Sequence, residues 1–198
     1  MAPDSMEKGI TFFKETVVPM ANSTPGNMGQ VLLVDRESGK GVGITMWDSP
    51  QALGASEQMG MTSRTGSIAV TGGQIVNVER MEQVINERVA PTQPGTSVRL
   101  NTIAGDPAKT DNAIKFVKNQ VLPVLKSQKG FQAMIMNVDR ITGRSTVSTV
   151  WATRADLEAS ESSVSGLRRD AADAAGAKDV TVELFEAAVT NIKQPATA

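Results

Sequence analysis

Apolar and polar positions alternate in the same order twice along the chain. Each time, apolar residues at helical spacing precede a β-hairpin, a second helix and an alternating strand. One further alternating stretch precedes only the second of these patterns. The pattern predicts first helices at residues 5–22 and 110–128, hairpin strands at 30–35 and 134–139 with return strands ending at Trp47 and Trp151, closing strands at 74–81 and 179–186, and the extra strand at 97–104.

Turn and cap residues occur at matching places in both patterns. Gly39 and Gly143 lie in the hairpin turns, where glycine supplies a positive φ at no steric cost. Ser49 and Thr153 are typical N-cap residues for the second helices. A proline late in each first helix is expected to kink or end it.

The two patterns overlay without a gap when the chain is displaced by 104 residues. A period near 100 residues indicates a duplicated domain, since solenoid repeats are much shorter. The matched segments include 34–36 with 138–140, 45–47 with 149–151, 53–57 with 157–161, and Arg64 with Arg168.

The extra strand at 97–104 distinguishes the two copies. With it, the second copy has the β-α-β-β-α-β order of a ferredoxin-like module. The overlay begins only at Pro3, so the first copy has no matching strand. We therefore predict an α+β fold of two tandem ferredoxin-like modules, residues 1–90 and 97–198, joined by a linker at 91–96.

The absent strand would be central in the first sheet, and unpaired buried backbone groups are costly. Upstream residues, the C-terminal arm at 187–193 or another chain could each supply a strand, or the sheet could rearrange around the gap. We expect a strand from elsewhere to close the first module, and therefore a homo-oligomer.

Composition narrows the chemistry. The chain has 20 basic and 21 acidic residues, a balance that argues against nucleic-acid binding. It has no long apolar run and no signal-peptide core, so we expect no membrane partner and a cytoplasmic location. Cys, His and Tyr are absent, which excludes the usual nucleophile–histidine arrangements and the commonest metal ligands. We expect neither a metal site nor a cofactor.

The order of an apolar strand, a glycine hairpin, a strand ending in Thr-x-Trp and a helix with Ala-Ser-Glu resembles the antibiotic biosynthesis monooxygenase superfamily. The resemblance implies a dimeric-type α/β barrel, with a small-molecule pocket between the helices and the sheet of each module. It also implies cofactor-independent oxygenase chemistry on phenols or quinols. The heme-degrading branch of the superfamily needs a histidine, which this chain lacks.

Within the resemblance, Asn101 and Trp151 match the recurrent asparagine and tryptophan of the site. We predict them as catalytic residues, Asn101 stabilising an anion and Trp151 stacking on a planar ligand, and we predict Asn137, Trp47 and Arg168 as substrate-binding residues. Each also has a structural interpretation, as core packing, a satisfied amide or a surface charge. Two functions stay open: a cofactor-free monooxygenase for a small hydrophobic or aromatic molecule, and a non-catalytic ligand-binding or stress-associated protein.

Overall fold

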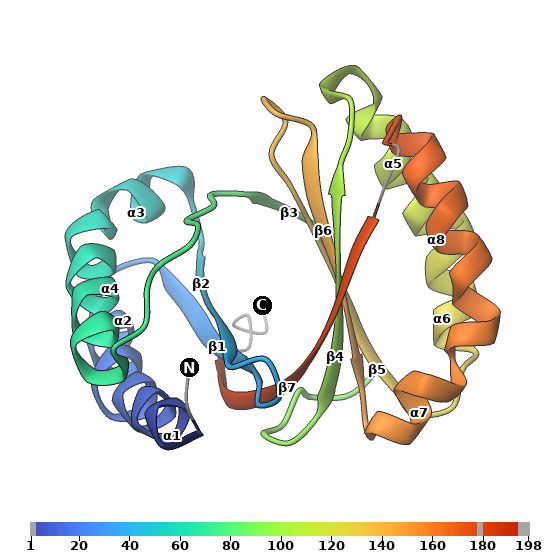
Figure 1. Cartoon of the computed structure of the whole chain (residues 1–198). Helices are drawn as coiled ribbons and strands as arrows, with labels where there is room; N and C mark the ends of the chain where they lie inside the picture. Colours follow the sequence, from blue (N-terminus) through green and yellow to red (C-terminus); the bar gives the residue numbers. More distant parts are fainter. Residues whose placement is uncertain (1–2, 178–179, 194–198) are drawn as a thin grey trace. The chain divides into compact units, whose positions relative to one another are not determined.

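The computed structural model describes residues 3–177 and 180–193 (Figure 1). By their contacts the residues form two compact units. The first unit comprises residues 1–78 and 186–198, and the second comprises residues 79–185. The strand β7 (Val180–Ile192) therefore begins in the second unit and ends in the first.

The second unit contains a complete ferredoxin-like module. In the β7-β4-β6-β5-β3 order of its strands, β4 lies between β7 and β6, and β3 adds an edge beyond β5. Helices α5, α6 and α8 cover one face of this sheet (Figure 1). Its elements are β3 (Glu82–Arg88), β4 (Ser97–Ala104), η2 (Pro107–Lys109), α5 (Thr110–Phe116), η3 (Val117–Val121), α6 (Leu122–Lys126), β5 (Phe131–Val138), β6 (Arg144–Trp151), α7 (Arg154–Ala159), α8 (Glu161–Ala175) and the start of β7.

The first unit has the same helices and hairpin but fewer strands. Its strand order is β2-β1-β7, with β7 contributing residues 186–192. Among the described residues, its first element is α1, which starts at Pro3. The elements are α1 (Pro3–Phe12), η1 (Phe13–Val17), α2 (Val18–Asn22), β1 (Asn27–Asp35), β2 (Lys40–Trp47), α3 (Pro50–Ala55) and α4 (Glu57–Thr71).

The prolines of the two first helices do not end them. Each follows a π-helical turn, η1 or η3, in which the N–H of Val18 donates to the carbonyl of Phe13 and that of Leu122 to Val117. Proline lacks the N–H for an ordinary helical bond and crowds the preceding turn. One wide turn accommodates it, and the helix then continues as α2 or α6.

In each unit, the first strand of the hairpin pairs with a strand from the other copy of the repeat. Strand β3 pairs with β5 so that Glu82 lies opposite Val138, and β7 pairs with β1 so that Glu186 lies opposite Val34. The two registers are related by the same displacement of 104 residues, irregularity included. The predicted fold class is confirmed as α+β with ferredoxin-like modules in tandem; their packing as a dimeric-type α/β barrel stays a prediction.

The prediction of a strand at residues 74–81 is wrong, because residues 72–81 adopt no regular secondary structure. The matching segment of the second module lies in β7 and pairs with β4, the strand that the first module lacks. Without that partner, 74–81 has no ladder to join. The matching strand predicted at 179–186 is found from Val180 onward, and Asp179 lies outside the described residues.

The C-terminal arm does not fill the missing position. Residues Ala187–Ile192 pair with β1, so β1 lies between them and β2. Self-association and closure of the first module by an outside strand stay predictions.

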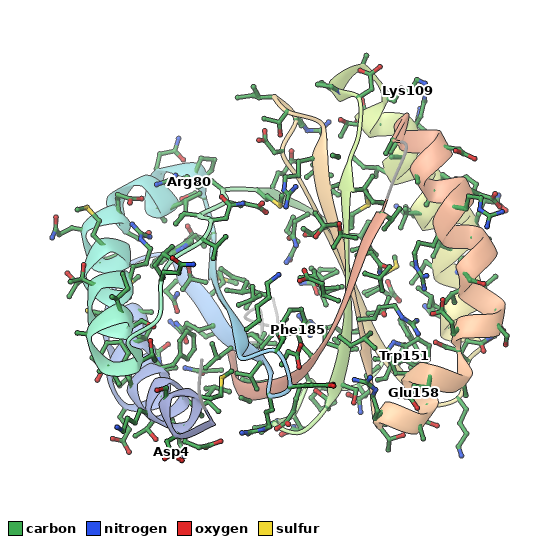
Figure 2. All side chains as sticks on the ribbon, viewed as in Figure 1. Asp4, Arg80, Lys109, Trp151, Glu158 and Phe185 are labelled. Atoms are coloured by element: carbon green, nitrogen blue, oxygen red, sulfur yellow. The ribbon has the colours of Figure 1, made fainter. Side chains whose placement is uncertain are left out.

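The hydrophobic core of the second unit is formed by residues of its sheet and of its helices. It includes Trp151, which is fully buried and contacts Phe131 edge to face with ring centroids 5.7 Å apart. In Figure 2, Trp151 lies on the helix side of its sheet. The core of the first unit centres on Phe13, Val17 and Val189.

Candidate functional site

A pocket opens in the second unit between the helix-covered face of the sheet and the helices themselves. Its volume is about 40 Å³, which is room for a few water molecules. Its wall is mostly apolar and includes both ends of the π turn η3. The lining residues are Arg99, Asn101, Ile103, Val117, Val121, Leu125, Val147, Thr149, Val164, Leu167, Arg168 and Ala171.

Asn101 presents an unpaired acceptor in this pocket. Its side-chain Nδ2 donates to the carbonyl of Val147 on β6 at 3.0 Å, which fixes the orientation of the amide. Its Oδ1 is buried and has no hydrogen-bond partner among the residues that the structure describes. A buried unsatisfied acceptor costs about 1–3 kcal/mol, so its retention favours a ligand that donates a hydrogen bond.

Two arginines and one carboxylate form the charged edge of the pocket. The guanidinium of Arg99, on a residue only 3% exposed, donates to Ser160 Oγ and the Leu157 carbonyl and pairs with Glu161 at 3.0 Å. Arg168 makes a two-pronged pair with the same carboxylate, at 2.9 and 2.8 Å. The cluster thus contains two positive charges and one negative charge, which gives it a net charge of +1.

The environment shifts two pKa values in this cluster. Hydrogen bonds from Arg168 lower the pKa of Glu161, with the charges of both arginines adding to the effect. Burial lowers the pKa of Arg99, and the charge of Glu161 opposes that shift. Arginine nevertheless stays protonated in proteins, so the pocket edge is cationic at neutral pH.

Trp151 lies beside the pocket and is not one of its lining residues. Its indole Nε1 donates to Thr149 Oγ1 at 2.9 Å, and Thr149 does line the pocket. The hydrogen bond and the contact with Phe131 hold the indole in the core. The tryptophan therefore acts on the pocket through Thr149 and through the packing of the sheet.

Asn137 and Trp47 lie away from the pocket. Asn137 pairs with Thr146, next to the pair of Met136 and Val147. Adjacent residues of a strand point to opposite faces of the sheet, and Val147 lines the pocket, so Asn137 points to the other face. There its Nδ2 donates to Thr146 Oγ1 at 3.2 Å. Trp47 is half-buried in the first unit and donates to Thr45 Oγ1. Of the five predicted site residues, the pocket contains Asn101 and Arg168.

Arg99 and Thr149 are pocket residues that the sequence interpretation missed. Arg99 precedes Asn101 by two positions in the same strand, and residues two apart share a face. A charge at that spacing within an apolar strand was the available signal. Thr149 belongs to the Thr-x-Trp motif, of which only the tryptophan was predicted as a site residue.

Across residues 3–177 and 180–193, no three acidic side chains gather in a way that could hold a metal ion. Over the same residues, no helix is long and apolar enough to cross a membrane.

Sequence comparisons connect the chain to proteins without an assigned activity. No protein-family model matches it. Two uncharacterised proteins of Mycobacterium tuberculosis (strain ATCC 25618 / H37Rv) are similar over nearly the whole chain. One is 26% identical over 192 residues, covering 97% of this chain and 85% of that protein. The other is 28% identical over 194 residues, covering 98% and 82%.

Solved structures share the fold at low sequence identity. A proposed monooxygenase from Lactobacillus acidophilus NCFM matches 98% of this chain and 92% of its own, with a TM-score of 0.68 at 10% identity. An anthrone oxidase-like protein matches 97% and 90%, also with a TM-score of 0.68, at 16% identity.

A ferredoxin-fold protein of Listeria monocytogenes 4b F2365 is described as related to antibiotic biosynthesis monooxygenases. It matches 85% of this chain and 85% of its own, with a TM-score of 0.51 at 10% identity. Together with the strand order of the second unit, these likenesses show that the chain has the fold of the antibiotic biosynthesis monooxygenase superfamily.

Proposed function

We propose that the pocket of the second unit binds a small hydroxylated aromatic molecule and oxidises it with O₂ without a cofactor. The observation that carries the proposal is the buried, unpartnered Oδ1 of Asn101 in an apolar pocket with a cationic edge. A phenol or enol matches this arrangement, since it has an apolar ring, a hydroxyl that donates and an anion that a guanidinium stabilises.

The polar side chains of the pocket have separate roles in this proposal. Asn101 Oδ1 accepts a hydrogen bond from a substrate hydroxyl and orients the ring. This role differs from the one expected from the sequence, since the free atom is an acceptor. Arg99 and Arg168 favour ionisation of the substrate, which makes it a better electron donor to O₂.

The overall change balances without an added reductant. A methylene next to the phenolic ring system and one O₂ give a carbonyl and one water, with all four electrons coming from the substrate. An anthrone oxidase-like protein shares the fold, which supports a substrate of this class. A polycyclic ring requires the lining side chains to move apart, because the present pocket holds only a few waters.

The second candidate is a non-catalytic binding protein. The observation that favours it is the absence of a proton acceptor from the pocket wall, where the titratable lining residues are Arg99 and Arg168. Such a site could hold a hydroxylated ligand without a base to ionise it. Binding is common to both candidates, and O₂ consumption distinguishes them.

The experiment uses one substitution at two places. Asn101→Leu removes the pocket acceptor, and Asn137→Leu makes the same change on the opposite face of the sheet. A panel of phenols, quinols and anthrones is tested for binding by thermal shift and for turnover with an oxygen electrode. We expect binding and O₂ uptake in the natural protein and Asn137→Leu, and loss of both in a folded Asn101→Leu.

Two outcomes contradict the oxygenase. Tight binding with no O₂ uptake for every panel member favours the non-catalytic candidate. Loss of binding in Asn137→Leu but not in Asn101→Leu puts the ligand on the other face of the sheet and overturns the assignment of the pocket.

A further inference from the structure

The hydroxyl of Thr149 is a buried hydrogen-bond donor at the pocket wall. The indole Nε1 of Trp151 donates to Thr149 Oγ1 at 2.9 Å, and an indole N–H can only donate. Thr149 Oγ1 is therefore the acceptor in this bond, which leaves its own proton for another partner. No acceptor for that proton lies among the residues that the structure describes. Thr149 is 3% exposed and lines the pocket, so a ligand there is the partner within its reach.

A buried acceptor lies beside this donor, on the neighbouring strand. Strands β4 and β6 pair so that Arg99 lies opposite Thr149 and Asn101 lies opposite Val147. All four residues line the pocket, so Asn101 and Thr149 are diagonal neighbours on one face of the sheet. Within the described part of the chain Asn101 Oδ1 has no partner, which means that Thr149 does not donate to it. The pocket therefore presents a free donor and a free acceptor next to each other.

Two oxygens on adjacent carbons of an aromatic ring match this pair. One hydroxyl oxygen can accept from Thr149 while the other hydroxyl donates to Asn101. Diagonal neighbours in a sheet are about 7–8 Å apart, so two ligand oxygens between their side chains must be close together. Arg99, the cross-strand partner of Thr149, favours ionisation of the oxygen bound there, and an ionised oxygen is the stronger acceptor.

We propose, resting on the binding function proposed for this pocket, that its ligand is an aromatic vicinal diol or a larger ring system that carries one. Thr149 donates to one oxygen, and Asn101 Oδ1 accepts from the other hydroxyl. Trp151 is a positioning residue that acts through Thr149, because its N–H occupies the threonine oxygen and so fixes the hydroxyl as a donor. The anion-stabilising donor that the sequence interpretation placed at Asn101 is then Thr149.

The first unit contains the same hydrogen bond in different surroundings. Trp47 Nε1 donates to Thr45 Oγ1 at 3.2 Å, but Thr45 is exposed. The bond by itself is thus a feature of the repeated motif, and the second unit adds burial of the threonine and a free acceptor beside it. Thr45 therefore provides a matched control for Thr149.

The first test compares three isomers on the natural protein. Catechol has its hydroxyls on adjacent carbons, whereas resorcinol and hydroquinone have the same groups further apart. Calorimetric titrations under nitrogen prevent oxidation of the diols. We expect catechol to bind at least about tenfold more tightly than either isomer, because only catechol makes both hydrogen bonds at once.

Substitutions of the two threonines locate the donor. Thr149→Val keeps the shape of the side chain without its hydroxyl, and should weaken catechol binding about tenfold and remove the preference over the isomers. Thr149→Ser keeps the hydroxyl and should retain the preference. Thr45→Val makes the same change in the first unit and should bind catechol like the natural protein. Circular dichroism establishes that each variant is folded.

A double-mutant cycle tests the role of Trp151. Trp151→Phe removes the N–H and should reduce the preference for catechol over resorcinol roughly threefold or more. In the Thr149→Val background the same substitution should leave that ratio unchanged, because the hydroxyl through which Trp151 acts is gone. A tryptophan with a purely structural role would affect the ratio equally in both backgrounds.

Three results overturn the vicinal-diol site: no preference for catechol in the natural protein, the same affinity in folded Thr149→Val and Thr45→Val, or equal effects of Trp151→Phe in both backgrounds. If Thr149→Val does not fold, loss of the preference in Thr149→Ser also overturns it. Its failure is distinct from failure of the oxygenase. Loss of phenol binding in Asn101→Leu with natural catechol binding in Thr149→Val removes the diol site alone, whereas the expected catechol pattern without O₂ uptake supports the diol site and removes the oxygenase.

Discussion

The two modules share a hairpin, a Thr-x-Trp strand end and a helix junction, yet one strand makes their interiors different. In the second module, β4 gives β6 and β7 a common neighbour, and Trp151 at the end of β6 is fully buried. In the first module, the matching tryptophan, Trp47, is only half-buried, and the closing segment forms no strand. Similar local sequences thus reach different states because a distant segment is present in only one of them.

Amide exchange should show the largest difference between the modules. We expect residues 76–81 to exchange at close to the rate of an unstructured peptide. The matching residues 180–185 should exchange at least about a thousandfold more slowly, because they open only with larger unfolding events. Hydrogen-exchange mass spectrometry measures both segments in one sample. Equal protection would show that 76–81 is paired in solution.

The tryptophans should differ in their effect on stability. Trp151→Ala removes a fully buried side chain and should cost about 3–5 kcal/mol of unfolding free energy. Trp47→Ala removes a half-buried one and should cost about 1–2 kcal/mol. Urea unfolding followed by circular dichroism gives both values, and equal costs would mean that Trp47 is covered in solution.

Substitution of one arginine in each module should also change the free energy of unfolding unequally, with a smaller difference than for the tryptophans. Arg99→Leu loses hydrogen bonds to two buried partners and should cost about 2 kcal/mol. Arg64→Leu removes a partly exposed ion pair on α4 and should cost less than about 1 kcal/mol. Thermal unfolding of the two variants side by side measures the contrast. A larger cost for Arg64→Leu would indicate that Arg64 supports the first module in a way its contacts do not show.

The smallest expected effect is a pH dependence of the second module. Because hydrogen bonds from Arg168 lower the pKa of Glu161, the folded state holds its proton less tightly than the unfolded state. The resulting stability is present above the unfolded glutamate pKa of about 4.3 and is lost as pH falls through the lower folded pKa. Unfolding the natural protein and Glu161→Gln between pH 2 and 6 should show a smaller loss in the variant, and parallel curves would exclude this contribution.

Much of the fold could be predicted because its signals are local. Strand β4 occupies the predicted residues 97–104, and Ser49 and Thr153 accept the N-cap hydrogen bonds expected of them, from the N–H groups of Ala52 and Asp156. Gly39 and Gly143 have the positive φ that the hairpins need. These features depend on a few neighbouring residues, so pattern and propensity suffice to locate them.

The site was only partly predictable because its members come from separate elements. Asn101 and Arg168 were identified, and they meet at one pocket although they are far apart in sequence. Arg99 was missed because a charged residue in a strand is ordinarily exposed, and its burial depends on three oxygens of the junction between α7 and α8. Asn137 looked equivalent to Asn101, but strand register turned it to the other face.

The sequence by itself determined the repeat, the order of elements in each module and the absence of histidine, cysteine and tyrosine chemistry. Tertiary structure decided which segments became strands and which polar atoms were left without partners. Residues 74–81 have the alternation of a strand, but a strand needs a neighbour to accept and donate its backbone hydrogen bonds. The unpaired Oδ1 of Asn101 likewise depends on the surrounding sheet and helices, whose described side chains and backbone offer it no donor.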